Sequence, residues 1–166
     1  MTTMTSERKA KVTLQGDRAF TIEREFDAPA HLVWEAWTKP EYIRQWWPTT
    51  RGADMVCEVD FRVGGNWRYS MVAGSTGEEV AFHGEYREIE PHSRIVSTEA
   101  YEMEGLTDED ASVNTLTLTE RDGKSFLHVL VEHRTPVHRD MHINSGMEGG
   151  LQDALDLLED VAQSLA

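Results

Sequence analysis

The sequence predicts an α+β fold in which a curved antiparallel sheet of about six or seven strands surrounds a long C-terminal helix. Three observations support this prediction. Residues 145–165 form one long amphipathic stretch, about six segments alternate between polar and apolar residues, and two short helical segments follow the first strand. Neighbouring hairpins build an antiparallel sheet, and helices on one of its faces bury that face, so these elements predict a layered domain.

The C-terminal stretch has the apolar spacing of a helix that buries one side. Its apolar residues recur at steps of three and four positions: Met147, Leu151, Ala154, Leu155, Leu158, Val161, Ala162 and Leu165. A helix of this length measures roughly 30 Å at about 1.5 Å per residue. No single short strand covers that length, so we expect a broad sheet opposite the helix.

The first strand is predicted over residues 19–26, and two short helices over 30–38 and 41–47 follow it. Proline suits the first turn of a helix, and Pro48 ends the second helix. Apolar residues alternate along the strand except at Arg24, which stands in the apolar register. We expect the stem of Arg24 to lie along the core with its charged head in water. The alternative is a cation inside a cavity.

The rest of the chain is predicted to be mostly strands and turns. Alternation indicates six further strands, over residues 55–63, 67–73, 80–90, 94–102, 113–120 and 125–134. Gly64-Gly65-Asn66 and Asp122-Gly123 are hairpin turn signals, and residues 104–110 form an acidic loop. Residues 1–16 carry little periodicity, so we predict a mobile N-terminal leader followed by a single domain over 17–166.

Composition excludes several classes of partner. The formal net charge of −14 repels phosphate backbones and anionic lipids, so we expect neither nucleic-acid nor membrane binding. No apolar run approaches the ~20 residues of a membrane span, and the N-terminus lacks a hydrophobic signal core, which favours a cytoplasmic location. Cys57 is the single cysteine, so no intrachain disulfide is predicted, and its thiol is expected to be inert.

Several short motifs occur in the order in which one protein family carries them. They are Phe26-Asp27-Ala28-Pro29, Val33-Trp34-Glu35-Ala36-Trp37-Thr38, Trp46-Trp47, Phe61-Arg62-Val63-Gly64-Gly65-Asn66-Trp67, Gly84-Glu85-Tyr86, Ile89-Glu90-Pro91 and Ser145-Gly146-Met147-Glu148-Gly149-Gly150-Leu151. In these motifs the chain resembles the activator-of-heat-shock-protein-90-ATPase homologue family. That family belongs to the START-like, or SRPBCC, superfamily with the helix-grip fold. The resemblance extends over residues 20–165.

The resemblance implies a cavity between the sheet and the C-terminal helix but no fixed catalytic set. The superfamily includes lipid and hormone carriers, polyketide cyclases and oxygenase subunits, so its fold does not determine one activity. The first hypothesis is therefore non-catalytic binding of a small hydrophobic or aromatic ligand. The alternatives are a chaperone-interacting module linked to stress response and a polyketide cyclase-like enzyme. We expect a monomer or a homodimer.

Aromatic and methionine side chains are the candidate ligand-binding residues, because they can line an apolar cavity. The predicted set is Trp34, Trp37, Trp67, Tyr69, Met71, Phe82, Tyr86, Met141, Met147 and Leu151. Trp46 and Trp47 are adjacent, so we do not expect both to point inward. For cyclase-like chemistry the candidates are Tyr69, Tyr86, Glu132 and His133.

The histidines give only weak signals of a site. His138, Asp140 and His142 would place two histidines on one helix face, as in some zinc sites, but no third ligand is evident. A solvated polar loop is the preferred interpretation, and neither a metal nor a cofactor is predicted. His83 and His128 are expected at the surface. The sequence carries no nucleophile elbow, phosphate loop or dinucleotide fingerprint, which favours binding over catalysis.

Overall fold

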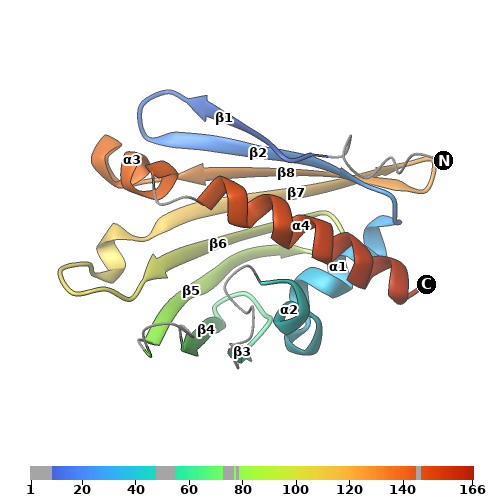
Figure 1. Ribbon diagram of the computed structural model, residues 1–166, viewed down its shortest axis with the longest axis horizontal. Coiled ribbons are helices and arrows are strands. Elements are labelled where there is room, and N and C mark those ends of the chain that lie inside the picture. The colour runs from blue at the N-terminus through green and yellow to red at the C-terminus, as the bar shows by residue number, and fades with distance from the viewer. Residues whose placement is uncertain (1–8, 48–54, 73–76, 78, 145–146) are drawn as a thin grey trace.

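The computed structural model describes residues 9–47, 55–72, 77, 79–144 and 147–166. These residues form one antiparallel sheet with the strand order β1-β2-β8-β7-β6-β5-β4-β3. The strands are β1 (Lys11–Gln15), β2 (Ala19–Phe26), β3 (Met55–Val59), β4 (Asn66–Val72), β5 (Glu79–Glu90), β6 (Arg94–Tyr101), β7 (Ser112–Arg121) and β8 (Lys124–Glu132). The sheet curves, and the helices lie on its concave side (Figure 1).

The predicted fold class is confirmed, with eight strands in place of six or seven. The additional strand is β1, which lies inside the segment predicted as a mobile leader. It pairs with β2 through the backbone along its whole length, from Lys11 opposite Glu23 to Gln15 opposite Ala19. Most of its side chains are exposed, so the apolar pattern that would have identified it is missing. Residues 1–8 of the leader lie outside the described residues.

The two short helices after the first predicted strand are confirmed as α1 (Ala30–Thr38) and α2 (Pro40–Trp46). A carboxylate oxygen of Glu120 accepts a hydrogen bond from the N–H of Ala30 at 2.7 Å, which satisfies one free donor of the first turn of α1. The indole N–H of Trp46 donates to the carbonyl of Ala36 at 2.8 Å. This bond fixes α2 against α1, and both helices pack on α4 (Met147–Ser164).

Helix α4 covers one half of the concave face. The inward-facing side chains there belong to β2, β7 and β8, and we call them the packed half: Phe20, Ile22, Arg24, Phe26, Leu116, Leu118, Leu127, Val129 and Val131. All are buried. They form one cluster with the apolar stripe of α4, including Leu155 and Leu158, neither of which is exposed. The predicted amphipathic helix and its broad sheet partner are therefore present.

Arg24 corrects the expectation of a charged head in water. Its side chain is 0% exposed, and its guanidinium pairs with Asp156 at 2.8 Å and with Glu159 at 3.4 Å, both on α4. It also lies 5.0 Å from the centre of the Phe26 ring. Glu159 accepts a further hydrogen bond from the N–H of Asp27 at 2.7 Å. The guanidinium of Arg24 is therefore neither in water nor in a cavity. It joins the sheet to α4.

The segment preferred as a solvated loop is the helix α3 (Pro136–Asn144). Its buried Arg139 donates to the carbonyls of Gly16 and Ala19, both at 3.1 Å. These contacts fix α3 to the turn between β1 and β2. None of the helices in the described part of the chain is long and apolar enough to cross a membrane.

Candidate functional site

The second half of the concave face carries five of the ten predicted ligand-binding residues. We call its inward-facing side chains on β4, β5 and β6 the aromatic half: Trp67, Tyr69, Met71, Phe82, Tyr86, Glu99 and Tyr101. The strand register places Tyr69 opposite Phe82 and Phe82 opposite Tyr101. Phe82 and Tyr101 stack with ring centres 5.1 Å apart, and the Trp67 and Tyr69 rings lie 4.6 Å apart. The three strands therefore present one aromatic surface.

Gly84 leaves room for the Trp67 ring on this surface. The two residues are directly opposite each other on β4 and β5. A Cβ atom at Gly84 would lie 1.8 Å from the carbonyl oxygen of Thr98 and 2.6 Å from Nε1 of Trp67. Any side chain at position 84 would therefore displace the Trp67 ring or the neighbouring strand. The Gly84-Glu85-Tyr86 motif thus has a packing role.

Trp47 extends the aromatic surface and was missed by the sequence reasoning. Its ring lies 4.8 Å from that of Tyr69 and 5.9 Å from that of Phe82. Trp46 is buried against Trp37 of α1, with ring centres 4.9 Å apart, so only one of the two adjacent tryptophans reaches the aromatic surface. Trp47 is the first residue after α2, so the chain has left the helix where its side chain turns to the sheet.

Two tyrosine hydroxyls meet in the aromatic half. Tyr69 and Tyr86 are hydrogen-bonded to one another, and burial raises the pKa of both well above the usual range. Both hydroxyls are therefore protonated at neutral pH. Since one hydrogen bond uses one of the two hydroxyl hydrogens, the pair retains one hydrogen that can be donated to another partner.

A carboxyl group lies on the same face, one strand further along. Glu99 on β6 stands opposite Ser112 on β7. One oxygen of Glu99 accepts a hydrogen bond from Nδ2 of Asn114 at 2.9 Å, and the Asn114 carbonyl accepts one from the hydroxyl of Ser112, also at 2.9 Å. Burial raises the pKa of Glu99, and the bond from Asn114 offsets this only in part. Sequence reasoning missed Glu99 because its strand alternates weakly.

Several of these inward-facing side chains keep partial contact with solvent. Phe82, Glu99 and Asn114 are each only partly buried, and so is Leu151 on α4. The corresponding positions of the packed half are closed to solvent. An inward-facing aromatic or carboxyl group with residual exposure indicates that the described residues do not fill the space beside it. The aromatic half is therefore the candidate site.

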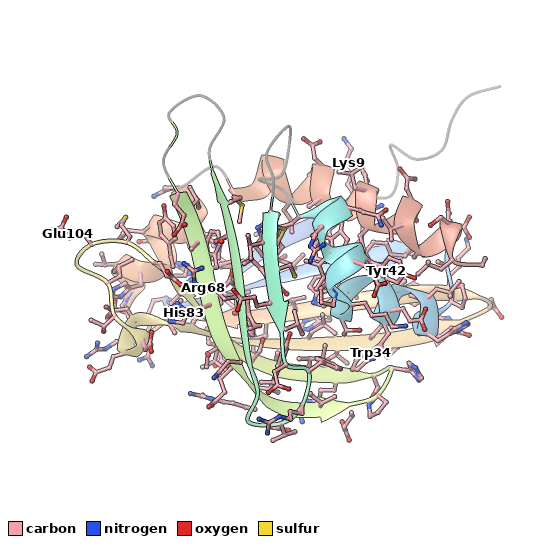
Figure 2. The ribbon with its side chains drawn as sticks, turned by 90° about the horizontal axis from the view of Figure 1, so that it is seen from below. Lys9, Trp34, Tyr42, Arg68, His83 and Glu104 are labelled. Carbon is pink, nitrogen blue, oxygen red and sulfur yellow. The ribbon has the colours of Figure 1, made fainter. Side chains whose placement is uncertain are left out.

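The remaining predicted ligand-binding residues lie elsewhere. Trp34 contacts Phe61 and His92 near the end of the sheet opposite the loop that carries Glu104 (Figure 2). Trp37 packs on Trp46, and Met141 is 47% exposed on α3. The side chain of Met147 lies outside the described residues.

Of the four residues predicted for cyclase-like chemistry, only Tyr69 and Tyr86 lie in the aromatic half. Glu132 is exposed at the end of β8. Nε2 of His133 lies 3.0 Å from Nδ1 of His142, and burial lowers the pKa of His133 to about 4. His133 therefore packs against α3 rather than beside the tyrosine pair.

The histidine spacing on α3 does not build a metal site. His138 lies 2.6 Å from the hydroxyl of Thr135 and 3.5 Å from Asp110, whereas His142 faces His133, the residue that follows β8. No group of three or more metal-ligating side chains occurs among the residues that the structure describes. Cys57 is buried on β3, and burial raises the pKa of its thiol to about 11, as an inert thiol requires.

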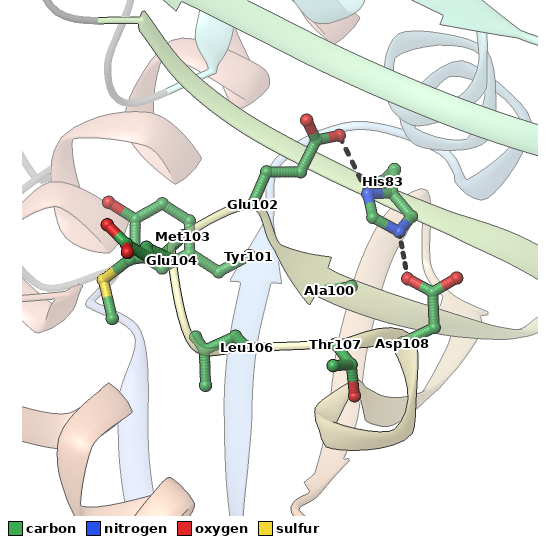
Figure 3. A pocket seen from close by; sticks show the side chains of 9 residues that line it. All are labelled: His83, Ala100, Tyr101, Glu102, Met103, Glu104, Leu106, Thr107 and Asp108. Atoms are coloured by element: carbon green, nitrogen blue, oxygen red, sulfur yellow. Dashed lines mark hydrogen bonds and ion pairs between the residues drawn. The ribbon is translucent and has the colours of Figure 1, made fainter.

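A separate pocket of about 500 Å³ opens on the outer side of β5 and β6 (Figure 3). His83 forms its polar wall, with Nδ1 2.8 Å from Glu102 and Nε2 2.5 Å from Asp108. Arg68, side by side with His83 on the neighbouring strand (Figure 2), donates two hydrogen bonds of 2.9 Å to Glu102. These bonds lower the pKa of Glu102 to about 2. The charges of this pocket are thus largely paired with one another.

Comparisons with known proteins identify the family. The family model described as "Activator of Hsp90 ATPase homolog 1-like protein" matches residues 27–163. No curated protein sequence matches the chain.

Solved structures share the fold. A Rhodobacter sphaeroides protein superposes with a TM-score of 0.82 at 23% identity, over 95% of this chain and 100% of that one. A Mycobacterium smegmatis protein gives 0.79 at 21% identity, over 94% and 98%. A Rhizobium leguminosarum protein gives 0.68 at 27% identity, over 95% and 98%. The chain therefore belongs to the activator of Hsp90 ATPase homologue 1-like family and has its START-like, helix-grip fold.

Proposed function

We propose that the protein binds a small, mainly aromatic molecule between the aromatic half of the sheet and α4. The observation that carries this proposal is the partial exposure of Phe82, Glu99 and Asn114, which all face inward. Ligand sites combine apolar and aromatic walls with a few polar groups that fix the orientation of the ligand, and this face offers both. The family is consistent with ligand binding in an apolar pocket.

Burial supplies the affinity in this proposal. Each Å² of apolar ligand surface removed from water contributes about 25 cal/mol. Stacking against the rings of Tyr69, Phe82 and Trp47 adds roughly 0.5–1.5 kcal/mol for each well-placed ring pair. The rings are held by one another and by the rigid strands, so little ordering of side chains opposes binding.

Nuclear magnetic resonance with 2-methoxynaphthalene as the probe tests the proposal. We expect the indole N–H signals of Trp67 and Trp47 to shift on titration, while that of Trp34 stays in place. Ser97→Phe fills the concave face opposite Tyr86 and should abolish the shifts. The matched control, Thr119→Phe, puts the same ring on the exposed outer side of β7 and should preserve them. Unshifted Trp67 and Trp47 signals up to the solubility limit of the probe would reject the proposal.

Interaction with a chaperone is a second candidate function, favoured by the name of the matching family model. With a net charge of −14 the protein would meet a basic surface, so its affinity should fall as salt rises. The test measures the ATPase rate of the Hsp90 chaperone with and without this protein. An unchanged rate at low and moderate salt would reject this candidate and leave the ligand proposal standing.

A further inference from the structure

Resting on the proposed function, we infer that the ligand carries an aromatic hydroxyl group, and that Glu99 accepts the hydrogen bond from it at the end of the aromatic half. The inference rests on the two hydrogen-bonding groups that this face offers. One is the second oxygen of Glu99, and the other is the remaining hydroxyl hydrogen of the Tyr69–Tyr86 pair.

The geometry around Glu99 occupies one carboxylate oxygen and leaves the other available. The Ser112 hydroxyl donates a hydrogen bond to the carbonyl oxygen of Asn114 at 2.9 Å. Nδ2 of Asn114 must then point at Glu99, which it contacts at 2.9 Å. Asn114 is thus locked as a donor to one oxygen. Among the described residues, nothing donates to the second oxygen of Glu99.

No positive charge balances Glu99 within the described part of the chain. The arginines and lysines that form ion pairs there are matched with other carboxylates, for example Arg68 with Glu102 and Arg24 with Glu159. A carboxyl group turned inward without a cation reduces stability, because burial removes part of its hydration. Such a group needs another reason to be present, and a hydrogen-bond donor on a ligand supplies one.

The tyrosine pair explains why the donor is a hydroxyl. The strand register places Tyr69, Phe82 and Tyr101 in one row across the sheet, and Glu99 lies two residues before Tyr101 on the same face. A ligand hydroxyl can accept the remaining hydrogen of the tyrosine pair and donate its own to Glu99, whereas an ammonium group can only donate. The rings of Phe82 and Tyr101 beside Glu99 suit an aromatic body for that hydroxyl.

The test compares 2-naphthol with 2-methoxynaphthalene. The two probes have the same rings, but in 2-methoxynaphthalene a methyl group replaces the hydroxyl hydrogen, so it cannot donate a hydrogen bond. We expect the intact protein to bind 2-naphthol roughly tenfold more tightly at neutral pH, as for a hydrogen bond to a charged group. Glu99→Gln should remove this preference, because Asn114 holds the amide oxygen and turns the amide N–H₂ towards the ligand. Glu102→Gln, on the outer side of the sheet, should retain it.

The outcomes separate the inference from the proposed function. If both probes bind equally, or if Glu99→Gln keeps the preference, the hydroxyl inference is wrong and the aromatic site stands. If neither probe shifts the Trp67 signal, the proposed function fails and the inference fails with it. The preference should also weaken as the pH is lowered, because Glu99, with its raised pKa, then becomes protonated.

Discussion

The inward-facing side chains of the two halves of the concave face have different packing partners. In the packed half, α4 closes the sheet with leucines and with the ion pairs of Arg24. In the aromatic half, the rings pack on one another, and the polar groups bond to neighbours on the sheet. The first half uses the helix as its partner. The second half belongs to the same core, but Phe82, Glu99 and Leu151 of α4 remain only partly buried there.

The difference is clearest in two charged side chains that face inward, Arg24 and Glu99. Arg24 has two carboxylates from α4 within 3.4 Å, so its charge is neutralised by the covering helix. Glu99 has an amide and no cation among the described residues. A charge that is paired within the protein stabilises the fold, whereas a charge without a counter-ion can bind a ligand.

Removing the cation of the packed half should have the largest effect. Arg24→Ala leaves Glu159 buried without its counter-ion and should reduce the free energy of unfolding by about 3–5 kcal/mol. Urea denaturation followed by tryptophan fluorescence measures the loss. Asp156→Ala is the matched control, because Asp156 is 58% exposed, and its loss should stay below about 1 kcal/mol. Equal losses for both variants would contradict a buried, structural role for the pair with Glu159.

Cavities should distinguish the two ends of α4. Leu158 is fully buried in the packed half, so Leu158→Ala should cost about 3 kcal/mol through lost burial and an unfilled cavity. Leu151 is only partly buried, and Leu151→Ala should cost about 1 kcal/mol or less, since solvent already reaches it. Thermal unfolding compares the two variants. A larger loss for Leu151→Ala would mean that the helix closes both halves equally.

The tyrosine pair should contribute modestly to stability. Tyr69→Phe and Tyr86→Phe each remove the shared hydrogen bond, at a cost of about 1 kcal/mol in the free energy of unfolding. The double variant should lose little more than either single one, because the same bond is broken in all three. A double-mutant cycle measured by denaturation gives this coupling. Fully additive losses would show that the hydroxyls do not act as a pair.

The sequence predicted the parts of the fold that depend on apolar periodicity. The α4 stripe, the two short helices and the Asp122-Gly123 turn, whose residues both have positive φ, are present as expected. β1 was missed because backbone pairing, rather than burial, holds it in place. α3 was missed because its anchor is a buried arginine that bonds to distant carbonyls.

The candidate site was predictable only in its aromatic part. Alternation placed Trp67, Tyr69 and Met71 on one face, and the structure confirms that they share it. Glu99 could not be recognised, because its environment depends on Asn114 from another strand. Trp47 required the backbone turn after α2. Contacts between elements distant in sequence therefore supplied the chemistry of the site.

The smallest effect is expected outside the concave face, at His83. Burial lowers the pKa of His83, but its bonds to Asp108 and Glu102 outweigh this and raise the pKa overall. Its contribution to stability is therefore complete below its unfolded pKa of about 6.5 and is lost as the pH rises through the higher folded value. Glu102, with a pKa of about 2, stays charged throughout this range.

His83→Gln should accordingly destabilise the protein more at pH 6 than at pH 9. The difference should stay below about 1 kcal/mol, because the His83 side chain is 33% exposed and water screens the pairs. Urea denaturation at the two pH values measures it, with His128→Gln on the exposed side of β8 as the control. If His83→Gln costs the same at both values, His83 is neutral in its bonds to Glu102 and Asp108, and no change in its charge stabilises the outer pocket. A confirmed pH dependence would instead show that the charged side chains of the outer face are paired with one another, as Arg24 is paired in the packed half. Glu99 would then remain the carboxyl group that is free to bind a ligand.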